Sequence, residues 1–255
     1  MGGGGFTMEE GSALDDFVLG LAPVREPRVC FLPTASGDPD AQIARFHDAF
    51  GDKACEPSFV SLFRLGGGKA PPVPLRELLL SQDVVYVGGG SMRNLLAIWR
   101  VHHLDNILRE AWERGVVLAG LSAGAMCWFD WGVTKSTGVP EPVEGLGLLP
   151  GSLTVHADGE PERAPVYRES VRTGVMPGGW AVDDGVGLLF RGTRLERAVS
   201  SRPDARAQRV ERVGEDVVCT PLLPTYLPGV PRLAERPVPA DIQEFRESRR
   251  YAGLR

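Results

Sequence analysis

The sequence has few cysteines, and their arrangement excludes several kinds of site. Four cysteines occur among 255 residues, at positions 30, 55, 127 and 219, and no two of them form a Cys-x-x-Cys pair. A structural zinc site and a dense disulfide framework are therefore not expected. Cys30 and Cys127 lie in apolar stretches, which predicts ordinary buried thiols. The sequence implies neither a metal ion nor an organic cofactor.

The chain also lacks basic clusters and long apolar runs. Its 28 Lys and Arg residues are scattered among 33 Asp and Glu residues, for a net charge of -5, so no nucleic-acid-binding surface is expected. No apolar run reaches the length of a membrane span. The first residues contain neither the basic region nor the apolar run of a signal peptide. These features predict a cytoplasmic protein without a membrane partner.

What the sequence does contain is an alternation of short β-branched runs with longer amphipathic segments. Strands are predicted at residues 28–33, 58–63, 83–87 and 116–119, and helices at 41–50, 93–100 and 104–114. This order predicts a three-layer α/β/α sandwich around a mostly parallel, flavodoxin-like sheet. Further strands are predicted at residues 153–155, 186–190 and 217–221. They indicate that the second half completes a mixed sheet.

Length and composition suit one large domain or two small ones. Residues 1–255 are predicted to form a single α/β domain, with a charged tail at about 241–255. The start of the chain is unusual, because Gly2 to Gly5 resemble a loop that should follow a strand, yet only Met1 precedes them. Two alternatives stay open: a first strand is missing from this chain, or the loop is a frayed terminus.

The strongest chemical signal is the segment GLSAGA at residues 120–125, which directly follows a predicted strand. Its G-x-S-x-G spacing is typical of a nucleophile elbow, where small residues must flank the serine because the backbone turns sharply. The alternative is a plain strand-to-helix turn with a capping serine, which would not need glycine and alanine on both sides. Ser122 is therefore the predicted nucleophile.

A serine nucleophile needs a base, and the chain has only four histidines. His47 falls within a predicted helix, and His102 and His103 lie at a helix junction. His156 follows the strand at 153–155 and precedes a turn, and such strand-end loops often carry active-site groups in α/β proteins. We predict His156 as the base, with an ordinary surface histidine as the alternative.

Two adjacent acids are candidates to orient the imidazole. Asp183 and Asp184 lie just before the strand at 186–190, in a turn with an Asp-Gly signature, and the spacing does not choose between them. A turn acid without a catalytic role is an almost equal alternative. No histidine follows Asp184, so the order serine, histidine, acid excludes the α/β-hydrolase fold, in which the acid precedes the histidine.

Three glycines, residues 88–90, close the strand at 83–87. Glycine lets backbone N–H groups point into a cleft without steric cost. One of these N–H groups and that of Ala123 would form an oxyanion hole, in which each donor lowers the barrier by roughly 3–4 kcal/mol. The alternative is a phosphate-binding turn, but no Walker lysine follows and the next residues do not resemble a nucleotide-binding fingerprint.

Together, the glycines at 88–90, the segment at 120–125 and His156 resemble the peptidase E family. These are serine peptidases of family S51, with a fold like that of class I glutamine amidotransferases. Further segments also resemble one branch of uncharacterised peptidases in this family: PTASGD at 33–38, AIWR at 97–100 and CWF at 127–129. The resemblance extends from about residue 2 to residue 227.

The resemblance implies a Ser-His-acid catalytic set and, in the best-known members, cleavage of dipeptides that begin with aspartate. Carried onto this sequence, Ser122 is the nucleophile, His156 is the base, and Asp184 stands where many members have a glutamate. Gly90 and Ala123 would supply the oxyanion amides. A short peptide is the implied partner, and a homodimer is left open.

Two arginines after His156 resemble those near the substrate pocket of the family. Arg163 and Arg168 would hold a substrate carboxylate through a guanidinium, with plain surface arginine as the alternative. Two positions depart from the family pattern: Ser91 replaces a common Asn, and Lys135 replaces an Asp. If that acid recognises the substrate α-amino group, a cation there would repel it, which weakens the expectation of aspartyl-dipeptide specificity more than that of hydrolysis.

Three rival interpretations accompany the peptidase prediction. One is a serine hydrolase with different substrates, and another is a catalytically silent binding protein that keeps the amidotransferase-like scaffold. A glutamine amidotransferase is the least favoured, because the elbow carries Ser122 in place of a cysteine and Cys127 lies beyond the elbow.

Overall fold

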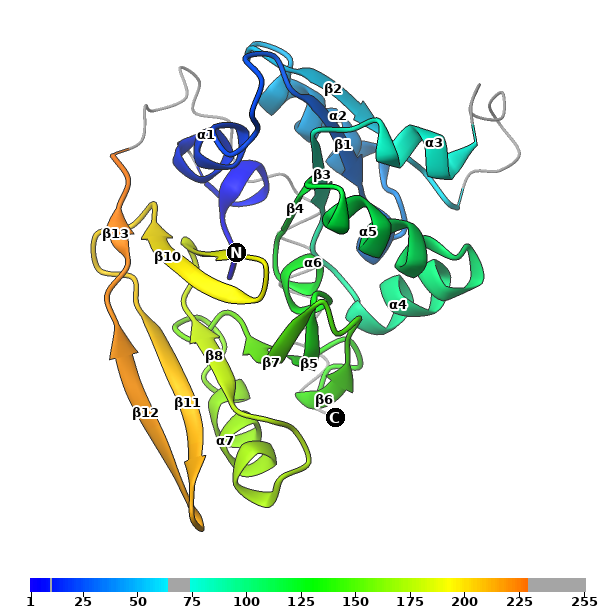
Figure 1. Ribbon diagram of the computed structural model, residues 1–255. Helices are drawn as coiled ribbons and strands as arrows, with labels where there is room; N and C mark the ends of the chain where they lie inside the picture. Colours follow the sequence, from blue (N-terminus) through cyan, green and yellow to red (C-terminus); the bar gives the residue numbers. More distant parts are fainter. Residues whose placement is uncertain (10, 64–73, 229–255) are drawn as a thin grey trace.

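The computed structural model describes residues 1–9, 11–63 and 74–228 (Figure 1). Strands and helices alternate through its first half. The strands there are β1 (Arg28–Leu32), β2 (Glu56–Phe59), β3 (Val84–Val87) and β4 (Val117–Gly120). The helices are α1 (Ala13–Leu19), α2 (Asp40–Phe50), α3 (Leu75–Leu80), α4 (Met92–Val101), α5 (Leu104–Glu113) and α6 (Ala123–Met126).

The four strands of the first half form a fully parallel sheet in the order β2-β1-β3-β4. The predicted parallel arrangement is confirmed. The prediction of a strand at 58–63 was wrong in its bounds, because β2 pairs with β1 only over Glu56–Phe59. As an edge strand with half-exposed residues, β2 has no clear apolar pattern to mark its ends.

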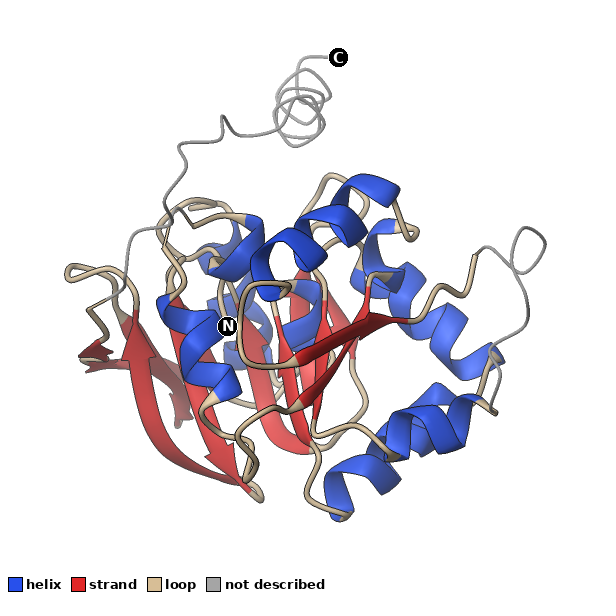
Figure 2. Ribbon diagram, turned by 90° about the horizontal axis from the view of Figure 1, so that it is seen from above, coloured by secondary structure: helices blue, strands red, loops and turns tan. Residues whose placement is uncertain are grey.

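Alternating residues of β1 show how helices cover both faces of this sheet. Val29 and Phe31 lie in one apolar cluster with residues of α1 and α2. Cys30 and Leu32 point the other way, into a cluster with α3, α4, α5 and α6. Figure 2 shows helices on both sides of the strands. The predicted three-layer sandwich is confirmed, and Cys30 is buried as expected.

The second half is strand-rich and mixed in direction, as predicted. Among the described residues, however, its strands form two sheets of their own and do not complete the parallel sheet. A six-stranded sheet has the order β12-β11-β8-β7-β5-β6, and a smaller one has the order β13-β10-β9. The strands are β5 (Phe129–Thr134), β6 (Glu141–Glu144), β7 (Leu149–Thr154), β8 (Gly179–Val182), β9 (Val186–Arg191), β10 (Arg194–Ser200), β11 (Ala207–Val213), β12 (Asp216–Leu222) and β13 (Thr225–Tyr226). Figure 1 shows β11 and β12 as a long hairpin.

Helix α7 (Arg163–Thr173) covers the six-stranded sheet, and the sequence analysis did not predict it. Its Tyr167 and Val171 pack in an apolar cluster with Val133 and Val210. Few other apolar residues lie along α7, so its helical periodicity is weak.

The N-terminus is not frayed, which corrects one of the two alternatives. The Met1 amino group donates to the Gly120 carbonyl at 2.9 Å, and the Met1 carbonyl accepts from the Ser122 amide at 3.1 Å. On the other side, the Gly2 amide donates to the Val186 carbonyl at 2.9 Å. Met1 and Gly2 therefore lie between β4 and β9, hydrogen-bonded to both.

Two expectations about the whole chain stay predictions. The charged tail at 241–255 lies outside the described residues, and nothing tests the prediction that residues 1–255 form one domain. Among the residues described, no helix combines the length and apolar character needed to cross a membrane.

Candidate active site

Ser122 occupies the sharp turn between β4 and α6. Its φ of 51° and ψ of -112° are unusual for a residue with a side chain, and such strain is typical of nucleophile elbows. A Cβ on Gly120 would come within 1.9 Å of the Gly124 carbonyl oxygen, and one on Gly124 within 2.5 Å of the Val87 carbonyl oxygen. Both glycines of the motif are therefore required by close backbone contacts.

The structure brings His156 to the predicted serine from the end of β7. The Ser122 Oγ lies 2.9 Å from the His156 Nε2, which is hydrogen-bonding distance. The His156 side chain is 14% exposed and its φ is 57°, so it is held in a restricted conformation at the edge of the solvent. His47 lies on α2 instead, and His102 and His103 lie between α4 and α5.

Asp184, rather than Asp183, contacts the imidazole. The Asp184 Oδ1 lies 2.5 Å from the His156 Nδ1. A ring that donates its Nδ1–H to this carboxylate presents the lone pair of Nε2 to the Ser122 hydroxyl. Asp183 instead accepts a hydrogen bond from the Arg206 amide at 2.8 Å, and burial raises the pKa of its carboxyl group.

Two residues that the sequence analysis missed hold the Asp184 loop. The Asp184 amide donates to Asp158 Oδ1 at 2.9 Å, and the Arg202 guanidinium donates to Asp158 Oδ2 at 2.7 Å. Burial alone would raise the pKa of Asp158, but these two hydrogen bonds hold it below its usual range. Asp158 was visible in the sequence only as a turn residue, and no sequence signal pointed to Arg202.

The N-terminal glycines make room for the acid. A Cβ on Gly3 would come within 2.3 Å of the Asp184 Oδ1. A side chain at position 3 would therefore displace the carboxylate that contacts His156. The glycine run at the start of the sequence was the one signal that could have indicated this close contact with the acid.

The two predicted oxyanion donors lie at the edge of the sheet where Ser122 emerges. The last residues of β3 and β4, Val87 and Gly120, pair with each other. Gly90 and Ala123 each lie three residues beyond one of these strand ends. Within the described part of the chain, neither amide donates a hydrogen bond to another residue. Both donors are therefore available to a negatively charged oxygen.

The two predicted substrate arginines have different environments. Arg163 is 4% exposed, and its guanidinium contacts Glu160 and the Val133 carbonyl, so the alternative of a surface arginine is wrong for it. Arg168 is exposed on α7. Both line a cavity of about 130 Å³, which Ala157, the residue after His156, also lines. Other residues that line it include Thr154, Tyr167, Asp183 and Arg206.

The two departures from the family pattern have local partners. The Lys135 ammonium pairs with the Glu162 carboxylate, which lowers the pKa of Glu162. The Ser91 side chain accepts from the Asn94 amide at 3.2 Å and caps α4. Lys135 is thus not an isolated positive charge, and Ser91 has a structural role.

Cys127 is a poor alternative nucleophile. Cys127 is buried, and burial raises the pKa of its thiol well above the usual range, which disfavours a thiolate. In residues 1–9, 11–63 and 74–228, no group of three or more His, Cys, Asp or Glu side chains is arranged to hold a metal ion.

Comparison with known proteins agrees with this geometry. The model of Peptidase family S51 matches residues 1–198. The chain belongs to peptidase family S51. The uncharacterized peptidase YgaJ of Bacillus subtilis (strain 168) is 46% identical to this chain over 228 residues, which is 89% of this chain and 97% of the relative. The predicted resemblance is confirmed, and this S51 chain is a serine peptidase or hydrolase by family.

Two further comparisons cover different lengths of the S51 chain. The crystal structure of a peptidase from an acI-B1 Actinobacterium has a TM-score of 0.62 at 21% identity, over 86% of this chain and 92% of that one. Imidazole glycerol phosphate synthase subunit HisH of Geobacillus thermodenitrificans (strain NG80-2) is 34% identical over 93 residues, 35% of this chain and 41% of the subunit. The solved structure supports the fold.

Proposed function

We propose that this S51 chain hydrolyses short peptides through a catalytic triad of Ser122, His156 and Asp184. The observation that carries the proposal is the continuous path of hydrogen bonds, 2.9 Å from Ser122 to His156 and 2.5 Å from His156 to Asp184. A hydroxyl, an imidazole and a carboxylate in this order are the parts needed to activate a serine.

In the proposed reaction, His156 Nε2 takes the proton of Ser122 as its Oγ attacks the peptide carbonyl carbon. The amides of Gly90 and Ala123 donate to the oxygen of the tetrahedral intermediate. The C–N bond then breaks, His156 gives its proton to the leaving amine, and an acyl ester remains on Ser122. Water, deprotonated by His156, attacks the ester, releases the acid product and restores the serine. Asp184 keeps the ring in the required tautomer.

The proposed substrates are short peptides whose first residue is acidic, with aspartate as the preferred residue. Arg168 lines the cavity that Ala157, the residue after His156, also lines, and it forms no ion pair with a described residue. Its guanidinium is therefore available to a substrate carboxylate. Arg163 has a structural role in the cavity wall, because its guanidinium already donates to Glu160 and to the Val133 carbonyl. Glu162 offsets the charge of Lys135, which reduces repulsion of a substrate amino group.

Turnover of a small substrate panel tests the proposal. The panel is Asp-Leu, Glu-Leu, Asn-Leu and Leu-Leu, each free and N-acetylated, together with p-nitrophenyl acetate. We expect hydrolysis of Asp-Leu above the others, and a loss of at least roughly 10³-fold in Ser122→Ala. Ester hydrolysis alone would indicate a serine hydrolase of different specificity, and equal turnover by Ser122→Ala would contradict the triad.

A further inference from the structure

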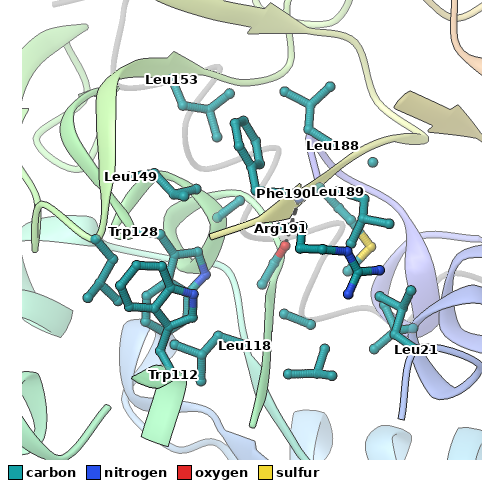
Figure 3. Close-up of a pocket in the computed structure, with 18 of the residues that line it drawn as sticks. Leu21, Trp112, Leu118, Trp128, Leu149, Leu153, Leu188, Leu189, Phe190 and Arg191 are labelled. Carbon is teal, nitrogen blue, oxygen red and sulfur yellow. Dashed lines mark hydrogen bonds between the residues drawn. The ribbon is translucent and has the colours of Figure 1, made fainter. Parts of the chain in front are cut away.

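An open slot separates β4 from β9. Among the strands that the structure describes, β4 pairs with β3 alone and β9 pairs with β10 alone, so each leaves one edge unpaired. The two edges line a cavity of about 340 Å³ (Figure 3). The lining includes every residue of 116–120 and of 186–192. The slot therefore follows both strands along their whole length.

The slot is apolar on both of its faces. Trp128, Leu149 and Leu153 line one face, next to Phe190 of β9 (Figure 3). The opposite face is formed by residues of α1 and its C-terminal turn. These are Leu14, Phe17, Val18 and Leu21. A strand in the slot would bury both its odd and its even side chains, as the inner strands of a covered parallel sheet do.

Met1 already makes the hydrogen bonds of a strand at one end of the slot. Its nitrogen donates to the Gly120 carbonyl and its carbonyl accepts from the Ser122 amide, the pattern of a parallel bridge to Leu121. On the other side, the Gly2 amide donates to the Val186 carbonyl, and the Gly3 carbonyl accepts from the Gly185 amide. A strand continuing backward from Met1 would run parallel to β4 and antiparallel to β9.

The free amino group of Met1 suits this position poorly. It is buried, and burial lowers its pKa from 8.0 to about 5. An amide nitrogen at the same place would make the same hydrogen bond to Gly120 without a charge to desolvate. The hydrogen bond to Gly120 and the cost of burying a charge thus both favour a peptide bond at the Met1 nitrogen.

We propose that the slot between β4 and β9 accepts an extended apolar segment of about five residues, matched to the rise of a strand, that is peptide-bonded to the nitrogen of Met1. The segment would join two sheets into one, in the order β2-β1-β3-β4-segment-β9-β10-β13. Ser122 follows β4 and Asp184 precedes β9, so the segment would also hold the two ends of the proposed triad in a common sheet.

Three forms of the chain test the proposal. One carries the apolar extension Met-Val-Ile-Val-Ala-Leu before Met1, the second carries the length-matched polar extension Met-Ser-Asn-Ser-Gln-Thr, and the third is the chain as printed. Hydrogen exchange read by mass spectrometry follows peptides that cover residues 116–122 and 186–192. We expect the apolar extension alone to slow exchange in both peptides at least tenfold and to raise the unfolding midpoint by 5 °C or more.

Other occupants of the slot give distinguishable results. Equal exchange in the apolar and polar forms would overturn the proposal. The proposal would also be overturned if a free, N-acetylated and C-amidated Val-Ile-Val-Ala-Leu peptide fully slowed exchange in the chain without an extension. Covalent continuity with Met1 would then be unnecessary. Protection that appears only with dimerisation in size-exclusion chromatography would show that a second copy closes the slot instead.

Discussion

One step along the chain separates the acid that contacts His156 from an acid that does not. Asp184 lies 2.5 Å from the imidazole, whereas Asp183 faces the neighbouring cavity and accepts from the Arg206 amide. Both residues lie between β8 and β9, and their carboxylates have different hydrogen-bond partners, so only Asp184 is placed to orient the imidazole. The pair therefore offers a matched comparison within one turn.

We predict that Asp184→Asn lowers kcat by roughly 10³- to 10⁴-fold, while Asp183→Asn changes it by less than about 5-fold. An amide at position 184 would donate to Nδ1 and leave a proton on Nε2, which then could not accept from Ser122. Steady-state kinetics on the best peptide of the panel measure both values, with circular dichroism to verify folding. Equal losses in the two folded variants would contradict the assignment of Asp184.

At this scale, motifs and spacing predicted the serine and the histidine, whereas only the family resemblance pointed to Asp184. Ser122 is marked by glycines that close contacts require, and His156 is marked by its place after a strand. The choice between two adjacent acids depends on the direction of each side chain in the folded loop. Arg202 lies 44 residues from Asp158 in sequence, so their contact could not be inferred from local spacing.

Helix α7 separates a structural arginine from a candidate substrate arginine. We predict that Arg163→Met lowers the free energy of unfolding by about 1–3 kcal/mol, because Glu160 and the buried Val133 carbonyl lose their partner. Arg168→Met should change stability by less than about 0.5 kcal/mol, since its side chain is exposed. It should instead raise KM for Asp-Leu at least tenfold and leave KM for Leu-Leu unchanged.

Urea unfolding and peptide kinetics on both variants check these outcomes. If Arg168→Met weakened acidic and neutral peptides equally, recognition of a substrate carboxylate by Arg168 would be wrong. If Arg163→Met were as stable as the parent chain, the prediction that the buried contacts of Arg163 stabilise the fold would be wrong.

Elements with strong periodicity were predictable, and those fixed by distant pairing were not. Helices α2, α4 and α5 each place apolar residues on one face, and their predicted bounds differ from the structure by only one residue or so. The ends of β2 are set by its pairing with β1, and α7 depends on the sheet it covers. Tertiary contacts decide such elements, so local sequence carries little of the information.

A chain that begins with a free amino group at Met1 is expected to have a pH-dependent stability, because this amine is buried. The pKa of the Met1 amino group is about 5 in the folded state against 8.0 as the ordinary value, so the unfolded state binds more protons between pH 5 and 8. The free energy of unfolding therefore rises with pH across this window. The total gain is at most roughly 4 kcal/mol, at about 1.36 kcal/mol per pKa unit.

The measurement is urea unfolding of the chain and of its Nα-acetylated form at pH 5.5, 6.5 and 7.5. The quantity compared is the difference in free energy of unfolding between the two forms. Acetylation removes the ionisable group, while every histidine stays the same in both forms. We expect the free-amine chain to lose stability relative to the acetylated one as the pH falls from 7.5 to 5.5. Intact-mass measurement verifies that Met1 is retained, and parallel pH profiles would contradict burial of the amine.

For the molecule as a whole, the sandwich and the S51 family were within reach of the sequence. The order of strands and helices, the elbow and the downstream histidine are spread over most of the chain, and together they are specific. The position of the N-terminus was not within reach. It depends on two strand edges, β4 and β9, that only the folded chain brings to face each other.

The central claim, that Ser122 is a nucleophile activated by His156, is tested most directly by mass spectrometry after treatment with a fluorophosphonate. The account predicts one phosphonyl group per chain, on the peptide that contains Ser122, absent from Ser122→Ala and formed at least roughly 10²-fold more slowly in His156→Ala. A folded chain whose Ser122 stays unmodified, or is modified at the same rate in His156→Ala, would contradict it.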